Sequence, residues 1–148
     1  MEASKGVRVC GIAIIVFGIY NLLGVGAYKQ FSMMFQPLPK IIILSLYLFT
    51  VFYGICGVYC GTKILRLEDW ARKVIVALTT INVISSLLLN RTVMANFKVF
   101  IQTEQSRVPP EIASDIYIYA VVLTAVVTIF ELSIIYFFTR PKVIEQFG

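Results

Sequence analysis

The sequence has 148 residues, of which 59% are hydrophobic and only 14% charged, and its formal net charge is +5. Soluble domains have about half apolar and about a quarter charged residues, so the composition excludes a soluble domain and predicts that a lipid bilayer surrounds most of the chain. The basic residues lie at the ends of hydrophobic runs rather than in one patch, which argues against a nucleic-acid partner. Histidine is absent, which removes the commonest zinc ligand and general base, so we expect no metal, no cofactor and no enzymatic activity.

Four long apolar runs predict four transmembrane helices, at about residues 8–28, 41–62, 72–92 and 115–139. Each is close to the roughly 20 residues that a helix needs to cross a bilayer. The first run is long for the apolar part of a cleaved signal peptide, so we expect it to be retained. The sequence therefore predicts an all-α integral membrane protein, a single domain over residues 1–148 that folds as an antiparallel, up-and-down four-helix bundle.

The basic residues also predict the orientation of the bundle. With both termini in the cytoplasm, eight of the 13 basic residues lie on the cytoplasmic side, and the other five lie outside. Since Lys and Arg are more frequent in cytoplasmic loops, this distribution favours cytoplasmic termini. The inner set is Lys5, Arg8, Lys63, Arg66, Arg72, Lys73, Arg140 and Lys142, and the outer set is Lys29, Lys40, Arg91, Lys98 and Arg107.

The segment between the first two runs, residues 29–40, is rich in aromatic and sulfur-containing side chains. We expect it to lie along the lipid headgroups rather than to project into water. The short turn between the second and third runs carries four residues with predicted roles. Asp69 would cap the third helix, Trp70 would anchor it at the interface, and Arg72 and Lys73 would face cytoplasmic headgroups.

Two further segments next to the last run have apolar residues at helical spacing. Residues 91–105 contain Val93, Met94, Phe97, Phe100 and Ile101, which predicts an amphipathic, interfacial extension of the third helix. Pro109 and Pro110 then break the chain and start the fourth helix. After Arg140, the tail carries Val143, Ile144 and Phe147, so it either folds back as a short interfacial turn or docks on the bundle.

Glu131 is the one ionisable residue well inside a predicted span. Burying a charged carboxylate there costs about 2.5–3.5 kcal/mol, so the side chain should face the bundle and be protonated or paired. At the same depth the antiparallel third helix offers Thr79 and Thr80, with Asn82 slightly further out, and these are its predicted partners. Three roles are open: fixing the register of the helices, coupling to protons or ions, and binding a cation of a partner subunit.

The second run contains Gly57 and Gly61 at the spacing of a G-x-x-x-G motif, with Gly54 one turn upstream. Small residues one turn apart allow the backbone of another helix to approach closely. We therefore expect an association surface here, either inside the bundle or between chains. Glycines in the first run, Gly11 and Gly18 among them, predict that the first two helices pack tightly.

Two short motifs carry a resemblance. They are Leu65-x-Leu67-x-x-Trp70-Ala71-Arg72 and Tyr136-Phe137-Phe138-x-Arg140-Pro141-x-Val143. Together with the four runs, they resemble a loose group of small uncharacterised bacterial four-helix integral membrane proteins, which implies a location in the bacterial cytoplasmic membrane but no activity. In helix number and length the chain is also similar to small multidrug transporters. Their membrane carboxylate lies in the first helix, where this chain has Asn21 instead.

Two functional hypotheses follow. The first is a non-enzymatic accessory or scaffold subunit that binds other membrane helices, or a second copy of itself, through its glycine face and interfacial loops. The alternative is a small proton- or ion-coupled carrier or channel component that works through Glu131. In both cases the lipid bilayer is the surrounding partner.

Overall fold

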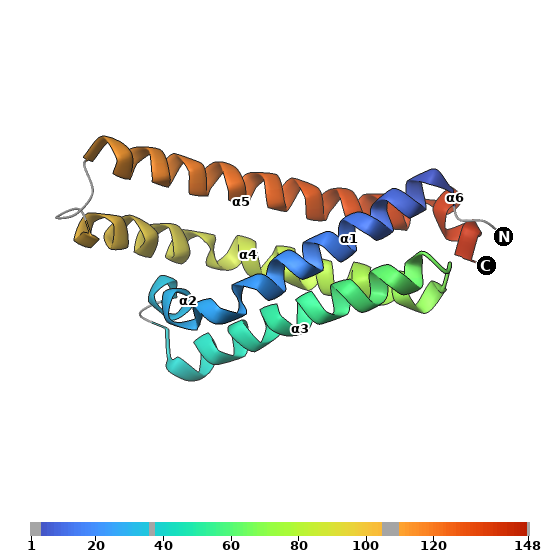
Figure 1. Cartoon of the computed structure of the whole chain (residues 1–148), viewed down its shortest axis with the longest axis horizontal. Coiled ribbons are helices and arrows are strands. Elements are labelled where there is room, and N and C mark those ends of the chain that lie inside the picture. Colours follow the sequence, from blue (N-terminus) through green and yellow to red (C-terminus); the bar gives the residue numbers. More distant parts are fainter. Residues whose placement is uncertain (1–3, 36–37, 105–109, 148) are drawn as a thin grey trace.

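The computed structural model describes residues 4–35, 38–104 and 110–147, and within these ranges the regular structure is entirely helical. Four long helices form the body of the molecule (Figure 1): α1 (Lys5–Leu23), α3 (Lys40–Ile64), α4 (Asp69–Glu104) and α5 (Pro110–Thr139). The short elements are η1 (Gly24–Ala27), α2 (Tyr28–Met34), α6 (Pro141–Ile144) and η2 (Glu145–Phe147).

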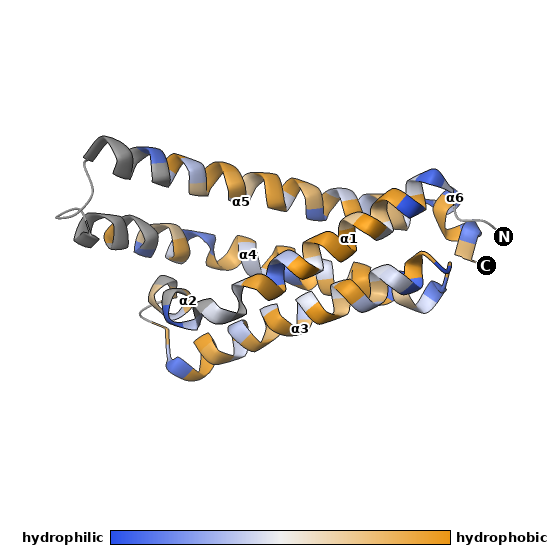
Figure 2. Cartoon of the chain, viewed as in Figure 1, coloured by the Kyte–Doolittle hydropathy of each residue, from blue (hydrophilic) through white to orange (hydrophobic). Residues whose placement is uncertain are grey.

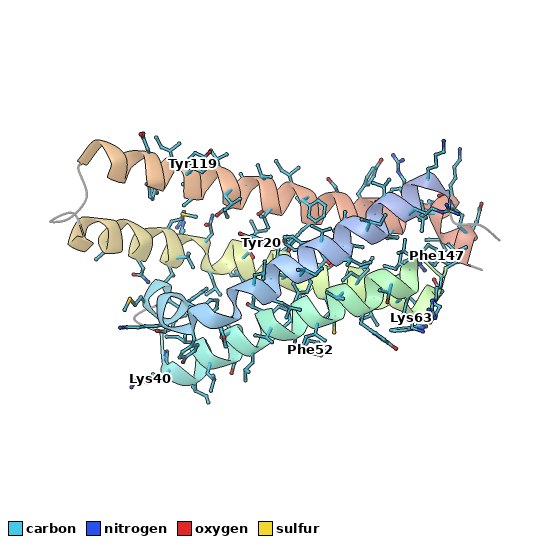
Figure 3. The ribbon with its side chains drawn as sticks, viewed as in Figure 1. Tyr20, Lys40, Phe52, Lys63, Tyr119 and Phe147 are labelled. Atoms are coloured by element: carbon cyan, nitrogen blue, oxygen red, sulfur yellow. The ribbon has the colours of Figure 1, made fainter. Side chains whose placement is uncertain are left out.

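All four long helices contain a segment that is long and apolar enough to cross a membrane, so the prediction of an all-α protein with four such helices is confirmed. These segments are Lys5–Leu23, Lys40–Ile64, Asp69–Asn96 and Tyr117–Thr139. Hydrophobic residues cover their outward surfaces (Figure 2), and Phe52 on α3 and Tyr119 on α5 point away from the bundle (Figure 3). An exposed apolar surface of this kind is suited to contact with lipid chains.

Both marked ends of the chain lie at one end of the molecule, which we call the termini end (Figure 1). The opposite end, where α1 gives way to α2, is called the α2 end. The first predicted span was too long: α1 ends at Leu23, and the two glycines of η1, which are poor helix formers, separate it from α2. The segment expected only to lie along headgroups forms α2, which packs against α3 and α4 and brings Phe31 and Tyr47 to a ring separation of 5.5 Å.

The third helix continues beyond its predicted span, as the sequence indicated, and runs as one α-helix to Glu104. The side chains of Phe97, Phe100 and Ile101, on which the predicted amphipathic face depends, lie outside the described residues. Pro109 is also outside them, whereas Pro110 is the first residue of α5. The helical extension is thus confirmed, and its interfacial position stays a prediction.

Helices α1 and α3 form the most extensive contact in the bundle, and glycines make it possible. A methyl group added at Gly18 would lie 2.8 Å from the carbonyl oxygen of Gly54 and 2.8 Å from the amide nitrogen of Val58. One added at Gly57 would lie 3.2 Å from the Cα atom of Gly18, and one at Gly61 would lie 3.0 Å from the carbonyl oxygen of Gly11. The predicted glycine face of Gly54, Gly57 and Gly61 therefore packs inside the bundle, against α1 of the same chain.

The apolar core lies mainly toward the termini end, and the C-terminal tail completes it. Val143 and Phe147 are buried, and the rings of Phe138 and Phe147 are 6.2 Å apart. Of the two alternatives for the tail, the structure shows docking on the bundle. Ile144 stays 40% exposed, so only part of the tail contributes to the core.

The close approach of α1 and α3 predicts a specific sensitivity at Gly18. The substitution Gly18→Ala should lower the free energy of unfolding by about 1–3 kcal/mol, because the added methyl group meets backbone atoms that cannot rotate away. Reversible unfolding of the detergent-solubilised protein measures this change. Gly26→Ala is the control, since nothing lies within 4 Å of a methyl group there, and it should stay within about 0.5 kcal/mol of the wild type. Equal stability of the two variants would contradict the packing described here.

Candidate functional site

Glu131 is directed into the bundle by its position on α5. It shares one face of that helix with Ile134 and Phe138, three and seven residues later, and all three are buried. The Glu131 side chain is only 1% exposed. A carboxyl group is thus enclosed among apolar side chains in the middle of a helix suited to crossing a membrane, where polar atoms need partners within the protein.

Side chains from two other helices supply those partners. The Asn82 amide on α4 donates a hydrogen bond of 2.7 Å to the Oε1 atom of Glu131. The Tyr53 hydroxyl on α3 donates a second bond of 3.4 Å to the same oxygen, and it is also 3.1 Å from the hydroxyl of the fully buried Thr79 on α4. We call Glu131, Asn82, Tyr53 and Thr79 the Glu131 network, and it joins α3, α4 and α5.

The predicted partners divide into three cases. Asn82 bonds directly to Glu131, and Thr79 connects to it through Tyr53. Thr80 does not join the network, because its hydroxyl donates instead to the Val76 carbonyl of its own helix at 2.8 Å. Tyr53 was not among the partners that the sequence predicted for Glu131. Its position near the middle of the second apolar run was the available signal.

The network can hold either a proton or a negative charge on Glu131. The Asn82 amide and Tyr53 hydroxyl both donate to one carboxyl oxygen, which stabilises the ionised form, while burial opposes it. None of the described basic residues forms an ion pair with Glu131, and the described residues include no cluster of metal-ligating side chains. What the described residues show at this site is hydrogen bonding to a buried carboxyl group.

A cavity of about 210 Å³ lies on the α2 side of the network, and we call it the central cavity. Asn82 lines it and also bonds Glu131, so this amide connects the carboxyl group to the cavity. On the α1 side of Tyr53 and Thr79, only a void of about 10 Å³ remains, lined mainly by apolar side chains. That volume is at the lower limit for a single water molecule. Among the described residues, Asn82 thus links Glu131 to the larger of these two spaces.

The turn between α3 and α4 forms a second polar group at the termini end. Lys63 pairs with Glu68 at 2.9 Å, and the indole nitrogen of Trp70 donates to the same carboxylate at 2.7 Å. Asp69 is the first residue of α4, and its carboxylate pairs with Lys73 at 2.6 Å. Trp70 and Lys73 are exposed, and the interfacial role expected of them stays a prediction.

Arg72 differs from its predicted role. It is only 8% exposed, and it donates a hydrogen bond of 2.9 Å to the carbonyl oxygen of Phe138 and another of 2.8 Å to Asp69. The reason lies in Pro141: the helix breaks before it, so carbonyl groups in the last turn of α5 lack their usual helical partners. A cation is favoured at that helix end. Arg72 thus fastens α4 to α5 rather than facing headgroups.

Comparison with known proteins gives no family: no family model, curated protein or solved structure matches the sequence. The resemblance to small bacterial four-helix membrane proteins therefore stays a prediction. Its two motifs meet in space, because Arg72 of the first bonds the Phe138 carbonyl of the second. Any role for the Glu131 network has to be argued from its own geometry.

The network predicts that Tyr53→Phe is destabilising, because this change removes the one hydroxyl that contacts both Glu131 and Thr79. Hydrogen bonds between membrane helices contribute roughly 0.6 kcal/mol each on average, so we expect a loss of about 0.5–2 kcal/mol in the free energy of unfolding. Unfolding in detergent measures it. Tyr59→Phe is the matched control on the same helix, at a side chain that is 54% exposed, and it should have no effect. The assignment would be wrong if the two variants behaved alike.

The α3–α4 turn predicts a pH dependence. The hydrogen bond from Lys63, together with that from Trp70, lowers the pKa of the Glu68 carboxyl below its usual value. Since the pKa is lower in the folded state, the carboxylate stabilises the fold above the ordinary value of about 4.3, and this contribution is lost as the pH falls through the folded-state pKa. Glu68→Gln should therefore lower the thermal midpoint at pH 7, and its difference from the wild type should shrink as the pH falls below the ordinary carboxyl value. A difference from wild type that does not shrink with falling pH would exclude this account.

Proposed function

We propose that the protein crosses a bacterial cytoplasmic membrane four times, as an antiparallel bundle with both termini in the cytoplasm. The start of α1, the α3–α4 turn and the docked tail meet at the termini end (Figure 1), where the predicted inner basic residues gather. This clustering supports the orientation, since Lys and Arg favour the cytoplasmic side. The central cavity then opens toward the opposite, outer half of the bundle.

Within this frame, we propose that the protein is a small proton-coupled carrier or channel component that works through Glu131. One observation carries the proposal: Asn82 bonds the buried carboxyl group at 2.7 Å and also lines the central cavity. A change in the protonation of Glu131 alters the hydrogen bond that it accepts from the Asn82 amide. The change would therefore alter the polar surface that Asn82 presents to a solute in the cavity. Ionisable side chains that face the interior of a membrane bundle are typical of proton relays.

In the scaffold hypothesis, the main surface for binding a partner helix was the glycine face of α3. Gly54, Gly57 and Gly61 were expected to bind a partner helix or remain inside the bundle, and they are covered by α1. A role as an accessory subunit would need one of the lipid-facing surfaces instead. It stays a second prediction, to be tested by purification from native membranes and identification of any fixed partner.

Proton flux into proteoliposomes tests the carrier proposal. With a pH-sensitive dye inside and an imposed pH gradient, wild-type vesicles should acidify faster than empty ones. Glu131→Gln should reduce the rate to that of empty vesicles. The substitution replaces the carboxyl group with an amide, which still forms hydrogen bonds but has no titratable proton.

Glu145→Gln is the matched control, because it makes the same change at an exposed position of the tail. Its flux should equal that of the wild type. Wild-type vesicles no faster than empty ones, or unaltered flux in Glu131→Gln, would contradict the proposal. Each variant is first compared with the wild type by circular dichroism and size-exclusion chromatography, so that loss of flux is scored only on folded protein.

A further inference from the structure

The central cavity has two unlike walls. Phenylalanine rings from α2, the segment after it and α3 form the first, and polar side chains of α4 form most of the second. The aromatic residues are Phe31, Phe35 and Phe49, and the polar ones on α4 are Asn82, Ser85, Ser86 and Asn90. An aromatic wall facing a row of hydrogen-bonding groups suits a ligand with an apolar body and a polar end.

Two of these hydroxyls, like that of Thr92 on the same helix, lack a hydrogen bond that most described hydroxyls in the long helices make. A serine or threonine in such a helix usually donates to a carbonyl one turn back, and Thr50, Thr124 and Ser133 do so at 2.7–3.0 Å. Among the described residues, Ser85 and Ser86 have no such hydrogen bond. Because polar groups at membrane depth need partners, these hydroxyls are available to a ligand in the cavity.

The cavity also continues sideways between helices. A second space of about 330 Å³ between α4 and α5 shares Asn90, Met94 and Thr124 with it, and its other residues include the exposed Val121 and Ile129. These exposed apolar residues belong to the surface that lipid chains would cover. The central cavity thus has a side opening toward the membrane interior, bordered by apolar side chains.

The volume of the central cavity and the charge of its lining limit the kinds of ligand that it can bind. At about 210 Å³, the central cavity is smaller than the roughly 300 Å³ at which pockets for whole drug-sized ligands begin, so it fits a headgroup whose remainder lies elsewhere. None of the described residues that line it is ionisable, so a charged headgroup would lose its hydration without a compensating ion pair from them. Glu131 does not line the cavity itself, since Asn82 stands between them.

We propose that the central cavity binds the uncharged, hydroxyl-bearing headgroup of a membrane lipid, whose chains leave through the opening between α4 and α5. Ser85 and Ser86 hydrogen-bond the headgroup, Asn82 bounds the inner end of the cavity, and the phenylalanine rings cover the glycerol backbone. Diacylglycerol has this chemistry. The inference goes beyond the proposed proton coupling and does not require Glu131 to titrate.

Native mass spectrometry of the full chain in detergent tests the inference, with dioleoylglycerol as the probe. Dioleoyl phosphatidylglycerol and protonated oleylamine serve as negatively and positively charged comparators. The wild type should retain one dioleoylglycerol at lower lipid concentration than either charged amphiphile. Ser86→Phe, which fills the cavity, should weaken this binding at least tenfold.

Matched variants keep the test interpretable. Ser133→Phe places the same bulk on the exposed surface of α5 and should bind as the wild type does. The double substitution Ser85→Ala and Ser86→Ala removes both hydroxyls without adding volume, and two hydrogen bonds of about 0.5–1.5 kcal/mol each correspond to a loss of about five- to a hundredfold in affinity. If Ser86→Phe fails to fold, the affinity of this double variant for dioleoylglycerol tests the lipid site in its place.

The outcomes separate the two proposals. Dioleoylglycerol binding that persists in Glu131→Gln supports the lipid site whatever the proton flux shows. Absence of a lipid adduct, equal or tighter retention of either charged amphiphile, or unchanged binding in the double alanine variant would overturn the lipid site and leave the flux experiment to stand by itself.

Discussion

A carboxyl group in the middle of a membrane helix has to find its hydrogen-bond partners inside the protein, and this requirement organises the bundle. Lipid chains offer neither donors nor acceptors, so Glu131 favours an arrangement in which α3 and α4 both reach it. Asn82 and Tyr53 satisfy one of its oxygens, and Tyr53 extends the contact to Thr79. Sliding one of these three helices along the others by a turn would separate the donors from the acceptor. The network therefore links α3, α4 and α5 to one another.

The two ends of the molecule are built differently. At the termini end, Arg72 fastens α4 to α5, the tail buries Phe147, and glycine contacts hold α1 against α3. At the α2 end, α2 lies against α3 and α4 (Figure 1), and its Phe31 lines the central cavity. Between the two ends, Asn82 connects the buried Glu131 to the central cavity.

The sequence predicted the helical architecture well, because a run of about 20 apolar residues has few alternatives to a membrane helix. It also predicted Asn82 and Thr79 at the depth of Glu131, since depth follows from the rise per residue. It did not distinguish Thr79 from Thr80, which differ by about 100° around α4, because the rotation of a helix about its axis depends on neighbours that the sequence does not identify. The sequence also did not predict the burial of Arg72, because that burial depends on where α5 ends. It did not predict Tyr53 as a partner of Glu131, because that contact depends on how α3 packs beside α4 and α5.

Reaction with a hydrophobic carbodiimide tests the central proposal most directly, namely that Glu131 is a protonatable group connected to the central cavity through Asn82. Such reagents modify carboxyl groups in their protonated state and enter from the bilayer. After treatment of the reconstituted protein and peptide mapping by mass spectrometry, the account predicts modification of Glu131 and a several-fold lower rate when Ser86→Phe fills the cavity. Failure of Glu131 to react, or an equal rate in wild type and Ser86→Phe, would contradict it.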